Sequence, residues 1–424
     1  MAAAESVTNI PWWREPTREQ WLTWWAAWLG WTLSAFDFTV FLLIIAPIAR
    51  EFGVSLAAVG AVFTPTLWMQ LVGAIGSGGL ADRIGRRTLL MISVLWYSIS
   101  NLIAGFSPTF WFLLLFRSLL RIGTGAVWPA SAVLAMEAWP ARSRGFMSGV
   151  LQGSWSLGVL LSSLIYGLFY HYIGWRGMLW IGILPALLVV YIRFYVKESG
   201  IWVENCHPQR IENREVRAPL ISIFKPGMLA NTVSVCWWTG SSYVVYYSIW
   251  GLSTVHLQKD LHLSPGLIAL PILLANLTTF FGMGFWGWTA DRLGRRWAMI
   301  IPAAIAIPVA PLYLFTADYA WLTLGFAVQG AFGGALASQF PSYLSERFPT
   351  EVRATASAFC SQQAGFLGSL LVAPELTSLA TSYNLSLATA MLVGTCVGVV
   401  SLVTALIFSP ETKGKVLVPD LVVA

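Results

Sequence analysis

The sequence predicts an all-α membrane protein with twelve transmembrane helices in two six-helix bundles and with both termini in the cytoplasm. Three observations support this prediction: an apolar composition, two sets of apolar segments, and a ten-residue pattern that occurs twice. Of the 424 residues, 57% are hydrophobic and 10% are charged, and the mean hydropathy is +0.69. Soluble globular proteins carry about 25% charged residues. Because so few charges cannot cover a surface that faces water, we expect a lipid bilayer around the chain.

The apolar segments are each long enough to cross a bilayer, which takes about 20 residues. The first set covers 21–48, 57–80, 88–105, 109–138, 146–170 and 176–196. The second set covers 227–256, 264–290, 296–316, 320–345, 354–380 and 385–409. The expected regions are a cytoplasmic amino-terminal tail (1–20), a first bundle (21–196), a cytoplasmic linker (197–226), a second bundle (227–409) and a cytoplasmic carboxy-terminal tail (410–424).

The ten-residue pattern follows the second apolar segment of each set. Residues 78–87 read GGLADRIGRR, and residues 287–296 read GWTADRLGRR. Asp291 follows Asp82 by 209 residues, close to half of the chain. A repeat at this spacing indicates two similar bundles in tandem. The pattern resembles the signature loop of the major facilitator superfamily, the twelve-helix secondary transporters.

Most lysines and arginines lie in the tails and in the connections after even-numbered segments. Because positive residues collect on the cytoplasmic side of membrane proteins, both termini are expected there. The net charge of +6 is then a set of orientation signals in short loops, so we expect no nucleic-acid partner. We expect a multi-pass protein of the plasma membrane, in a bacterium the inner membrane, and a monomer.

The repeated loops are expected to form a gate between the bundles. Asp82 and Asp291 can each face the amino end of a helix in the other bundle and interact favourably with its dipole. The resemblance implies that such contacts lock the cytoplasmic side when the central cavity faces outward. The alternative is that the basic loops only fix the topology. The expected gating residues are Gly78, Asp82, Arg83, Arg86, Glu137, Arg144, Gly287, Asp291, Arg292, Arg295, Glu346 and Arg353.

Three ionisable residues lie deep in apolar segments, where a charge costs on the order of several kcal/mol. Asp37 lies near the middle of the first segment, and Arg117 and Arg121 lie one turn apart on one face of the fourth. An arginine fork suits a carboxylate ligand. A buried carboxylate that can gain and lose an arginine contact is suited to carry a proton. We therefore assign Asp37 and Arg117 to proton coupling and Arg121 to substrate; an ion pair that only joins two helices is the alternative.

The second bundle offers aromatic faces and hydrogen bonds but no acid that matches Asp37. Core packing is the alternative for any single aromatic residue. The sequence shows no metal-binding cluster and no nucleophile–base constellation, so we expect neither a cofactor nor an enzyme. Beside Arg121, the expected substrate-binding residues are Trp128, Tyr243, Tyr246, Tyr247, Asn276, Gln329 and Gln362.

The first bundle also resembles the bacterial sialic-acid proton symporters and their relatives that carry lactate and aromatic acids. The resemblance rests on residues 9–14 (NIPWWR), Phe36-Asp37-Phe38, residues 137–140 (EAWP) and residues 174–176 (GWR). It implies proton-coupled symport of an organic anion, such as a monocarboxylate or a sugar acid, by alternating access. Three positions depart from the family pattern: Ser34 and Val127 stand where many members have acids, and Arg121 stands where a glycine is usual.

Two other functions remain open at this point. The aromatic content is compatible with a proton-antiport exporter of amphipathic compounds. The paired arginines argue against this alternative. A membrane sensor that does not transport would be expected to carry a signalling domain or a long tail.

Overall fold

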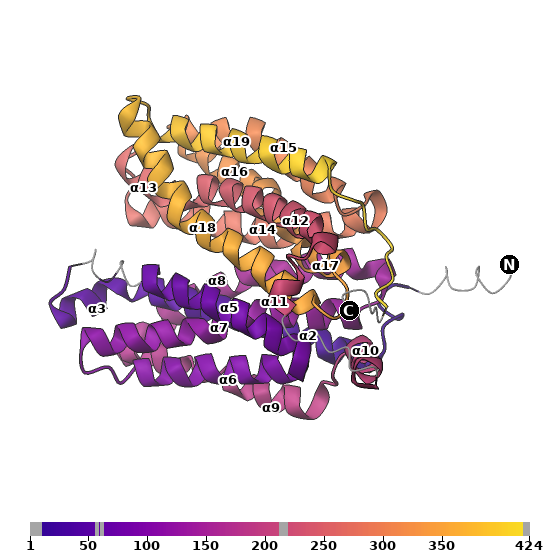
Figure 1. The fold of residues 1–424 in the computed structure, drawn as a ribbon. Coiled ribbons are helices and arrows are strands. Elements are labelled where there is room, and N and C mark those ends of the chain that lie inside the picture. The colour runs from indigo at the N-terminus through magenta and orange to yellow at the C-terminus, as the bar shows by residue number, and fades with distance from the viewer. Residues whose placement is uncertain (1–10, 56–58, 60–62, 212–218, 419–424) are drawn as a thin grey trace.

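The structure, a computed structural model, describes residues 11–55, 59, 63–211 and 219–418. These residues form helices joined by turns, and no strand occurs among them. Figure 1 shows the helices of residues 18–195 gathered along one side and those of residues 226–407 along the other, which we call the first half and the second half. Parts of the expected tails and of the expected linker lie outside the described residues.

The first half begins with two consecutive helices and ends with a short one. Its helices are α2 (Arg18–Leu43), α3 (Ile45–Phe52), α5 (Phe63–Ile84), α6 (Arg86–Ala104), α7 (Phe110–Ala138), η2 (Ala141–Ser143), α8 (Arg144–Ile181) and α9 (Ala186–Tyr195). Two further helices, α10 (Gly200–Ile211) and α11 (Pro219–Ser222), lie between the halves in the sequence.

The second half has a similar order of long helices with more interruptions. Its helices are α12 (Pro226–Tyr246), η3 (Tyr247–Gly251), α13 (Ser253–Lys259), α14 (Pro265–Leu293), α15 (Trp297–Leu314), α16 (Tyr319–Gln329), η4 (Gly330–Gly334), η5 (Ala335–Gln339), α17 (Phe340–Arg347), α18 (Arg353–Ser382) and α19 (Leu387–Ile407).

Local sequence explains where several helices begin. Thr17 and Gln20 form a capping box at the start of α2, which satisfies backbone N–H groups that the helix leaves free. Asp318 caps α16 in the same way, by accepting from two backbone N–H groups. Pro226 occupies the first position of α12, where its missing N–H has no cost.

Several helices are interrupted inside the expected membrane segments. The backbone of α8 turns at Gly174 (φ 62°, ψ −172°), a conformation that glycine adopts readily. The expected helix over 176–196 is two helices, because residues 182–185 form a turn between α8 and α9. The π-helices η3 and η4 interrupt α12 and α16, and such π-helical turns often mark functional sites.

Eight helical stretches of the described residues are long and apolar enough to cross a membrane, by length and composition alone. They are 18–43, 86–104, 110–138, 141–181, 266–293, 297–314, 319–347 and 387–407. The all-helical membrane fold is therefore confirmed. The count of twelve spans, the cytoplasmic termini and the domain boundaries stay predictions.

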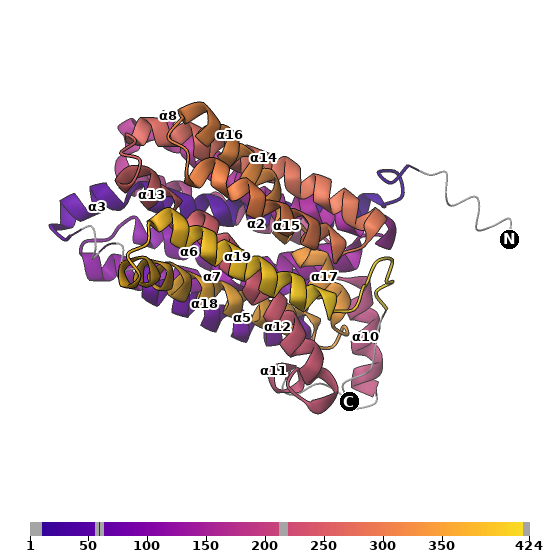
Figure 2. The same cartoon turned by 90° about the horizontal axis from the view of Figure 1, so that it is seen from above.

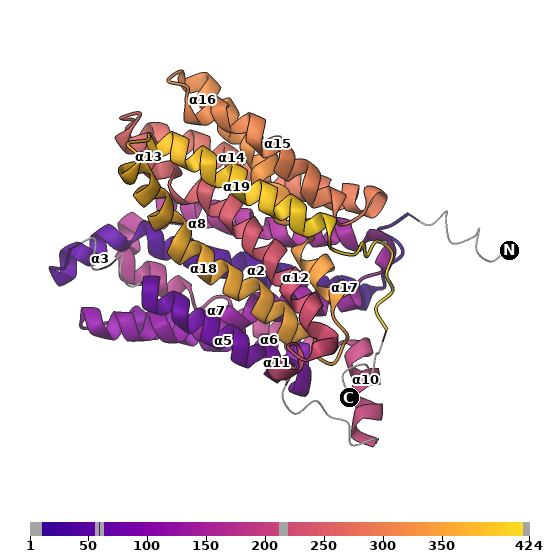
Figure 3. The same ribbon diagram turned by 45° about the horizontal axis from the view of Figure 1, so that its top comes forward.

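Within the described part of the chain, the halves meet chiefly along two helix pairs. Helix α5 packs on α18, and α8 packs on α14. Figure 2 shows these pairs on opposite sides of the molecule. Both signature loops lie at one end of these pairs, together with α10 and the segment after α19 (Figure 3). We call this end of the molecule the loop end.

Candidate functional site

A buried ion pair lies inside the first half. Asp37 on α2 and Arg117 on α7 are each 1% exposed, and Arg117 Nη1 lies 3.4 Å from Asp37 Oδ1. The same nitrogen donates to Asn101 Oδ1 on α6 at 2.9 Å, and the guanidinium lies over the ring of Phe41. Oδ2 of Asp37 has no hydrogen-bond partner among the described residues. The arginine thus holds one of the two carboxylate oxygens.

Arg121 lies one turn further along α7 and makes different contacts. Its guanidinium packs over Phe38, 4.7 Å from the ring centroid, and Nη1 donates to Gln70 Oε1 on α5 at 3.4 Å. The residue is 5% exposed, and no carboxylate of the described residues lies within 4.0 Å of its guanidinium. A buried cation is costly without a counter-charge. The contacts match the expected division between Arg117 and Arg121, while their roles stay predictions.

Tryptophans pack around the same part of α2, α7 and α8. Trp31 packs against Trp128 and Trp155, with ring centroids 6.2 and 4.7 Å apart, and Trp155 in turn packs on Phe38. Trp128 Nε1 donates to Gln152 Oε1 at 2.9 Å. Trp128 also joins a buried cluster whose other members come mainly from the second half. Trp128 therefore lies at the contact between the halves.

Three tyrosines lie where α12 passes into η3. Tyr243 and Tyr247 stack with ring centroids 6.1 Å apart, and Tyr247 is close enough to Arg121 to interact with it electrostatically across the halves. Tyr246 is 38% exposed. It lies on the side of α12 opposite the exposed Trp237, because nine residues correspond to two and a half helical turns. Tyr247 thus lies within electrostatic range of Arg121, and Tyr246 is exposed on the face of α12 opposite Trp237.

The expected amides have different surroundings. Gln362 on α18 accepts from Gln70 Nε2 at 3.0 Å, and Gln70 in turn contacts Arg121. Asn276 donates to a carbonyl of its own helix, that of Ile272, at 3.0 Å. Gln329 is fully buried before η4, and neither polar atom of its amide has a partner in the described part of the chain. Hydrogen bonds between described residues therefore connect Gln362 to Arg121 through Gln70. They do not connect Asn276 or Gln329 to Arg121.

Asp82 makes the cross-half contact that its position predicts. It accepts hydrogen bonds from the backbone N–H groups of Ala354 and Thr355 at 3.2 and 2.9 Å, where α18 begins, and from Thr355 Oγ1 at 2.6 Å. These N–H groups have no partner within their own helix and form the positive end of its dipole. A Cβ at Gly78 would lie 2.7 Å from the Cα of Thr355, so only glycine permits this approach.

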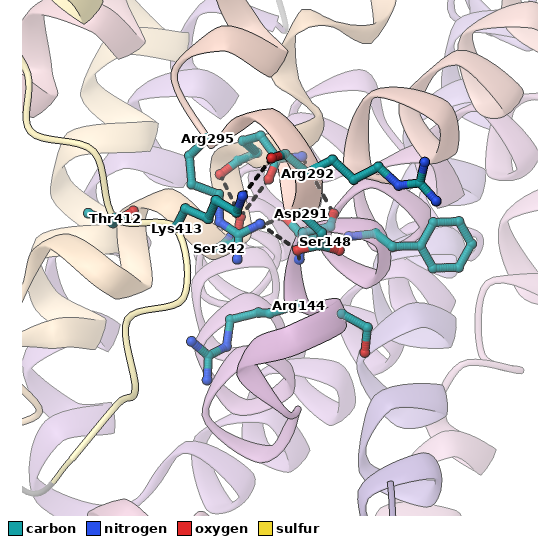
Figure 4. A network of polar contacts seen from close by, with 12 residues as sticks. Arg144, Ser148, Asp291, Arg292, Arg295, Ser342, Thr412 and Lys413 are labelled. Atoms are coloured by element: carbon teal, nitrogen blue, oxygen red, sulfur yellow. Dashed lines mark hydrogen bonds and ion pairs between the residues drawn. The ribbon is translucent and has the colours of Figure 1, made fainter. Parts of the chain in front are cut away.

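Asp291 makes the equivalent contact in the opposite direction. It accepts from the backbone N–H groups of Gly145 and Phe146, both at 2.8 Å, where α8 begins (Figure 4). A Cβ at Gly287 would lie 2.6 Å from the carbonyl oxygen of Gly145. Each signature loop therefore caps a helix of the other half.

Glu137, at the end of α7, joins two arginines from different halves. Arg353 Nη1 donates to Glu137 Oε1 at 2.6 Å, and Arg86 Nε lies 3.4 Å from Glu137 Oε2. Arg86 also lies 3.1 Å from Asp82. All of these side chains are nearly fully buried.

Glu346, at the end of α17, repeats this arrangement. It lies 3.1 Å from Arg295 Nη2 of its own half and 3.3 Å from Arg144 Nη1 of the first half. Arg295 also lies 2.7 Å from Asp291. The segment after α19 covers this cluster, because Thr412 donates to Glu346 at 2.6 Å and Arg144 donates to the carbonyl of Lys415 at 2.8 Å (Figure 4).

Arg83 and Arg292 lie at the surface of the loop end and not in these two buried clusters. Both side chains are exposed, and the guanidinium of Arg292 lies over the ring of Trp288 at 3.7 Å. Exposed arginines at such a position suit the orientation signal expected from the sequence.

Several contributors to these contacts are not among the residues expected from the sequence. Glu198 accepts from the backbone N–H of Arg86 where α6 begins, and Glu411 accepts from that of Arg295 shortly before α15. Their signal was an acid at matching places after the sixth and twelfth apolar segments. Gln70 and Asn101 were also missed. Each is the single amide side chain of an otherwise apolar segment (57–80 and 88–105), and that was the signal available.

Burial raises the pKa of Asp82 to about 6, although Arg86 and the hydrogen bonds from Thr355 act in the opposite direction. Asp82 lies just beyond the expected membrane segment 57–80. The closed contact therefore binds a proton more readily than a water-exposed aspartate does. No group of three or more His, Cys, Asp or Glu side chains placed to hold a metal ion is found in the described part of the chain.

The helices and the repeated contacts of the loop end define a helical membrane protein built from two related halves. The family model of the Major Facilitator Superfamily matches residues 27–255 and 236–420. The chain therefore belongs to the Major Facilitator Superfamily, which confirms the resemblance seen in the signature loops. It belongs with transporters and not with enzymes.

Two relatives and one solved structure show how closely the chain resembles known members. A probable 4-methylmuconolactone transporter of Cupriavidus pinatubonensis is 28% identical over 414 residues, which cover 95% of this chain and 93% of that one. A sialic acid transporter of Escherichia coli is 25% identical over 346 residues, 81% and 83% of the two chains. A proton:xylose symporter superposes with a TM-score of 0.75 at 20% identity, covering 94% and 98%, and this likeness shows the fold alone.

Proposed function

We propose that the protein is a secondary active transporter that carries an organic anion together with protons by alternating access. The observation that carries this proposal is Arg121, a buried guanidinium without a carboxylate within 4.0 Å among the described residues. A carboxylate of the substrate would supply the missing negative charge through paired hydrogen bonds.

The surroundings of Arg121 favour an acid with an apolar or unsaturated body. Phe38 lies under the guanidinium, and Tyr247 approaches from the second half. The names of the two relatives, a sialic acid and a muconolactone transporter, support an organic acid as the substrate class. Monocarboxylates and sugar acids both remain within the proposal.

Asp37 is the proposed proton carrier. Its single contact with Arg117 at 3.4 Å is long, and its second oxygen has no hydrogen-bond partner within the described residues. Protonation would release Arg117 from Asp37, and deprotonation would restore the pair. The proton and the anion would then occupy neighbouring turns of α7.

The loop end is the proposed cytoplasmic side of a bacterial inner-membrane protein. Its arginines follow the positive-inside pattern, and the described parts of both expected tails lie there. The two caps and the two glutamate clusters would close this side while the opposite side admits substrate. We propose twelve spans in a monomer, because each apolar segment of the sequence contains helix in the structure.

Uptake by proteoliposomes tests the proposal. Labelled lactate, benzoate, cis,cis-muconate and N-acetylneuraminate would be offered with the outside acidic and with no pH gradient. Accumulation of at least one acid that requires both protein and gradient is expected, with protein-free vesicles as the control for passive entry of the protonated acid. If no acid accumulates while an amphipathic dye moves against protons, the exporter function replaces this proposal.

A further inference from the structure

A chain of polar contacts leads from Arg121 to the other half of the molecule. Arg121 Nη1 donates to Gln70 Oε1 at 3.4 Å, and Gln70 Nε2 donates to Gln362 Oε1 at 3.0 Å. Arg121 lies on α7 and Gln70 on α5, both in the first half, whereas Gln362 lies on α18 of the second half. One amide thus uses its acceptor on the buried cation and its donor on the opposite half.

Gln70 is held in this position by its own backbone. Helix α7 approaches α5 so closely that a Cβ at Gly125 would lie 2.2 Å from the carbonyl oxygen of Gln70. The side chain therefore starts from a fixed point beside α7. With its oxygen held by Arg121, the amide directs Nε2 to Gln362.

The bridge lies in the middle of an interface that must separate when the loop end opens. On the side of the loop end, Asp82 caps α18. On the other side of the bridge, the rings of Trp68 and Phe366 pack with centroids 4.6 Å apart. Among the described residues, no side-chain hydrogen bond of this kind joins α8 to α14. At the offset of 209 residues, Gln70 corresponds to Thr279, which donates to the carbonyl of Gly330 in its own half, and Gln362 corresponds to Gly153.

An anion and Gln70 compete for the same guanidinium. A carboxylate binds a guanidinium more strongly than a neutral amide oxygen does, because both groups are charged and two parallel hydrogen bonds can form. Binding of the anion at Arg121 would therefore displace the oxygen of Gln70. The amide would then lose the contact that orients its N–H towards Gln362.

We propose that Gln70 is a positioning residue that couples anion binding at Arg121 to the separation of α5 from α18 through its bridge to Gln362. This inference rests on the proposed function, since it assumes that Arg121 binds the transported anion. The coupling acts on one of the two cross-half interfaces. Substrate occupancy would loosen α5 from α18 first, while α8 and α14 stay packed.

Hydrogen exchange on the full-length protein can test this coupling without a reporter group. The backbone N–H groups of Ala354 and Thr355 are bonded only across the halves, so they exchange when α5 leaves α18. Those of Gly145 and Phe146 report on α8 and α14 in the same way. Mass spectrometry would follow both segments, with and without benzoate.

The variants are Gln70→Leu, Gln70→Asn and Gln362→Leu, with Gln363→Leu as the matched control. Gln363 neighbours Gln362, but its amide donates to the carbonyl of Cys360 in its own helix. The shorter asparagine keeps the polarity of residue 70 but cannot span both partners. Thermal unfolding of each variant would establish that the fold is intact.

Without benzoate, exchange at residues 354–355 should rise by about two- to tenfold in the three bridge variants, which corresponds to one net hydrogen bond, and stay unchanged in Gln363→Leu. With benzoate, exchange there should rise in the parent and in Gln363→Leu, but little further in the bridge variants. Exchange at residues 145–146 should respond less in every case.

Affinity separates this role from a direct contact with substrate. Benzoate should bind Gln70→Leu at least as tightly as the parent, because it no longer displaces an amide. A several-fold loss of affinity, or exchange in the bridge variants equal to that in Gln363→Leu, would overturn the proposal. If the parent does not bind benzoate or any other acid tested, the proposed function fails, and the benzoate-free exchange still decides whether the bridge exists.

Discussion

The two halves of the molecule are equivalent at the loop end and different in the middle. At a constant offset of 209 residues, every member of the gate has a counterpart of the same type: Asp82 and Asp291, Arg86 and Arg295, Glu137 and Glu346, Arg144 and Arg353. At the same offset, the central charges of the first half have none. Asp37 corresponds to Tyr246, Arg117 to Phe326, and Arg121 to Gly330.

Under the proposed function, this difference follows from the different tasks of the two regions. Closing the loop end requires a carboxylate from each half to meet a helix amino terminus of the other, so both copies are needed for a balanced contact. Binding one anion requires one guanidinium fork. A second buried set of charges would add several kcal/mol of desolvation without a second ligand to compensate it. The second half accordingly contributes rings and amides.

Loss of the Asp37 carboxylate in the first half should have the largest effect on transport. Asp37→Asn should reduce gradient-driven accumulation at least about tenfold, because the site can no longer bind and release a proton. Exchange of preloaded anion should persist. Glu51→Gln is the control, since Glu51 is a carboxylate at the far end of the same half that pairs with Arg176. Full accumulation by Asp37→Asn would show that the asymmetry in charge has no role in coupling.

Substitutions of Arg117 and Arg121 should change different properties of transport. Arg121→Lys keeps the charge but loses the fork, and it should weaken anion binding by about 1.5–3 kcal/mol while leaving the pH profile of transport nearly unchanged. Arg117→Lys should shift the pH profile more than the affinity, because it contacts Asp37. Binding isotherms and pH–rate profiles of both variants decide this. Unchanged affinity in Arg121→Lys would remove the main support for a carboxylate substrate.

Loss of either cap should have matched, smaller effects. Asp82→Ala should raise hydrogen exchange at residues 354–355, and Asp291→Ala at residues 145–146, each by the equivalent of about 1 kcal/mol. The physical reason is the same in both, since each loses a carboxylate at a helix amino terminus. An increase in one variant alone would show that the halves are not equivalent at the loop end.

Acidification should have the smallest effect. The closed state holds Asp82 with a pKa of about 6, above the value of 3.8 for an aspartate in water, so the closed state binds the proton more tightly. Lowering the pH from about 7.5 to about 5.5 should therefore favour the closed loop end by about fourfold. Exchange at residues 354–355, corrected for the intrinsic effect of pH, should fall in the parent. The same fall in Asp82→Ala would assign it to another group.

The contacts between the halves at the loop end could be predicted because their determinants are local and repeated. The repeat identifies equivalent positions, and the free N–H groups of a helix amino terminus attract a carboxylate wherever the helix begins. The pairing of Arg117 with Asp37 could also be predicted from the sequence. Charged residues are rare within membrane segments, so each has few possible partners of opposite charge.

The surroundings of Arg121 could not be predicted in the same way. Helix α14 is apolar on all sides, so its sequence does not show which face turns to the centre, and Asn276 bonds within its own helix. Gln70 became important only because Gly125 allows α7 to reach its backbone. Such contacts depend on how the helices pack against one another, and the hydrophobic periodicity of a single segment does not determine that packing.

Proton movement during anion entry tests the central claim most directly, namely that a buried acid in the first half couples protons to an organic anion. Proteoliposomes with a trapped pH-sensitive dye would receive the carboxylate that the parent accumulates, at equal pH inside and outside. The lumen should acidify as the anion enters through the parent, beyond the change in protein-free vesicles, and this acidification should vanish in Asp37→Asn. Anion entry through the parent without proton entry would contradict the account.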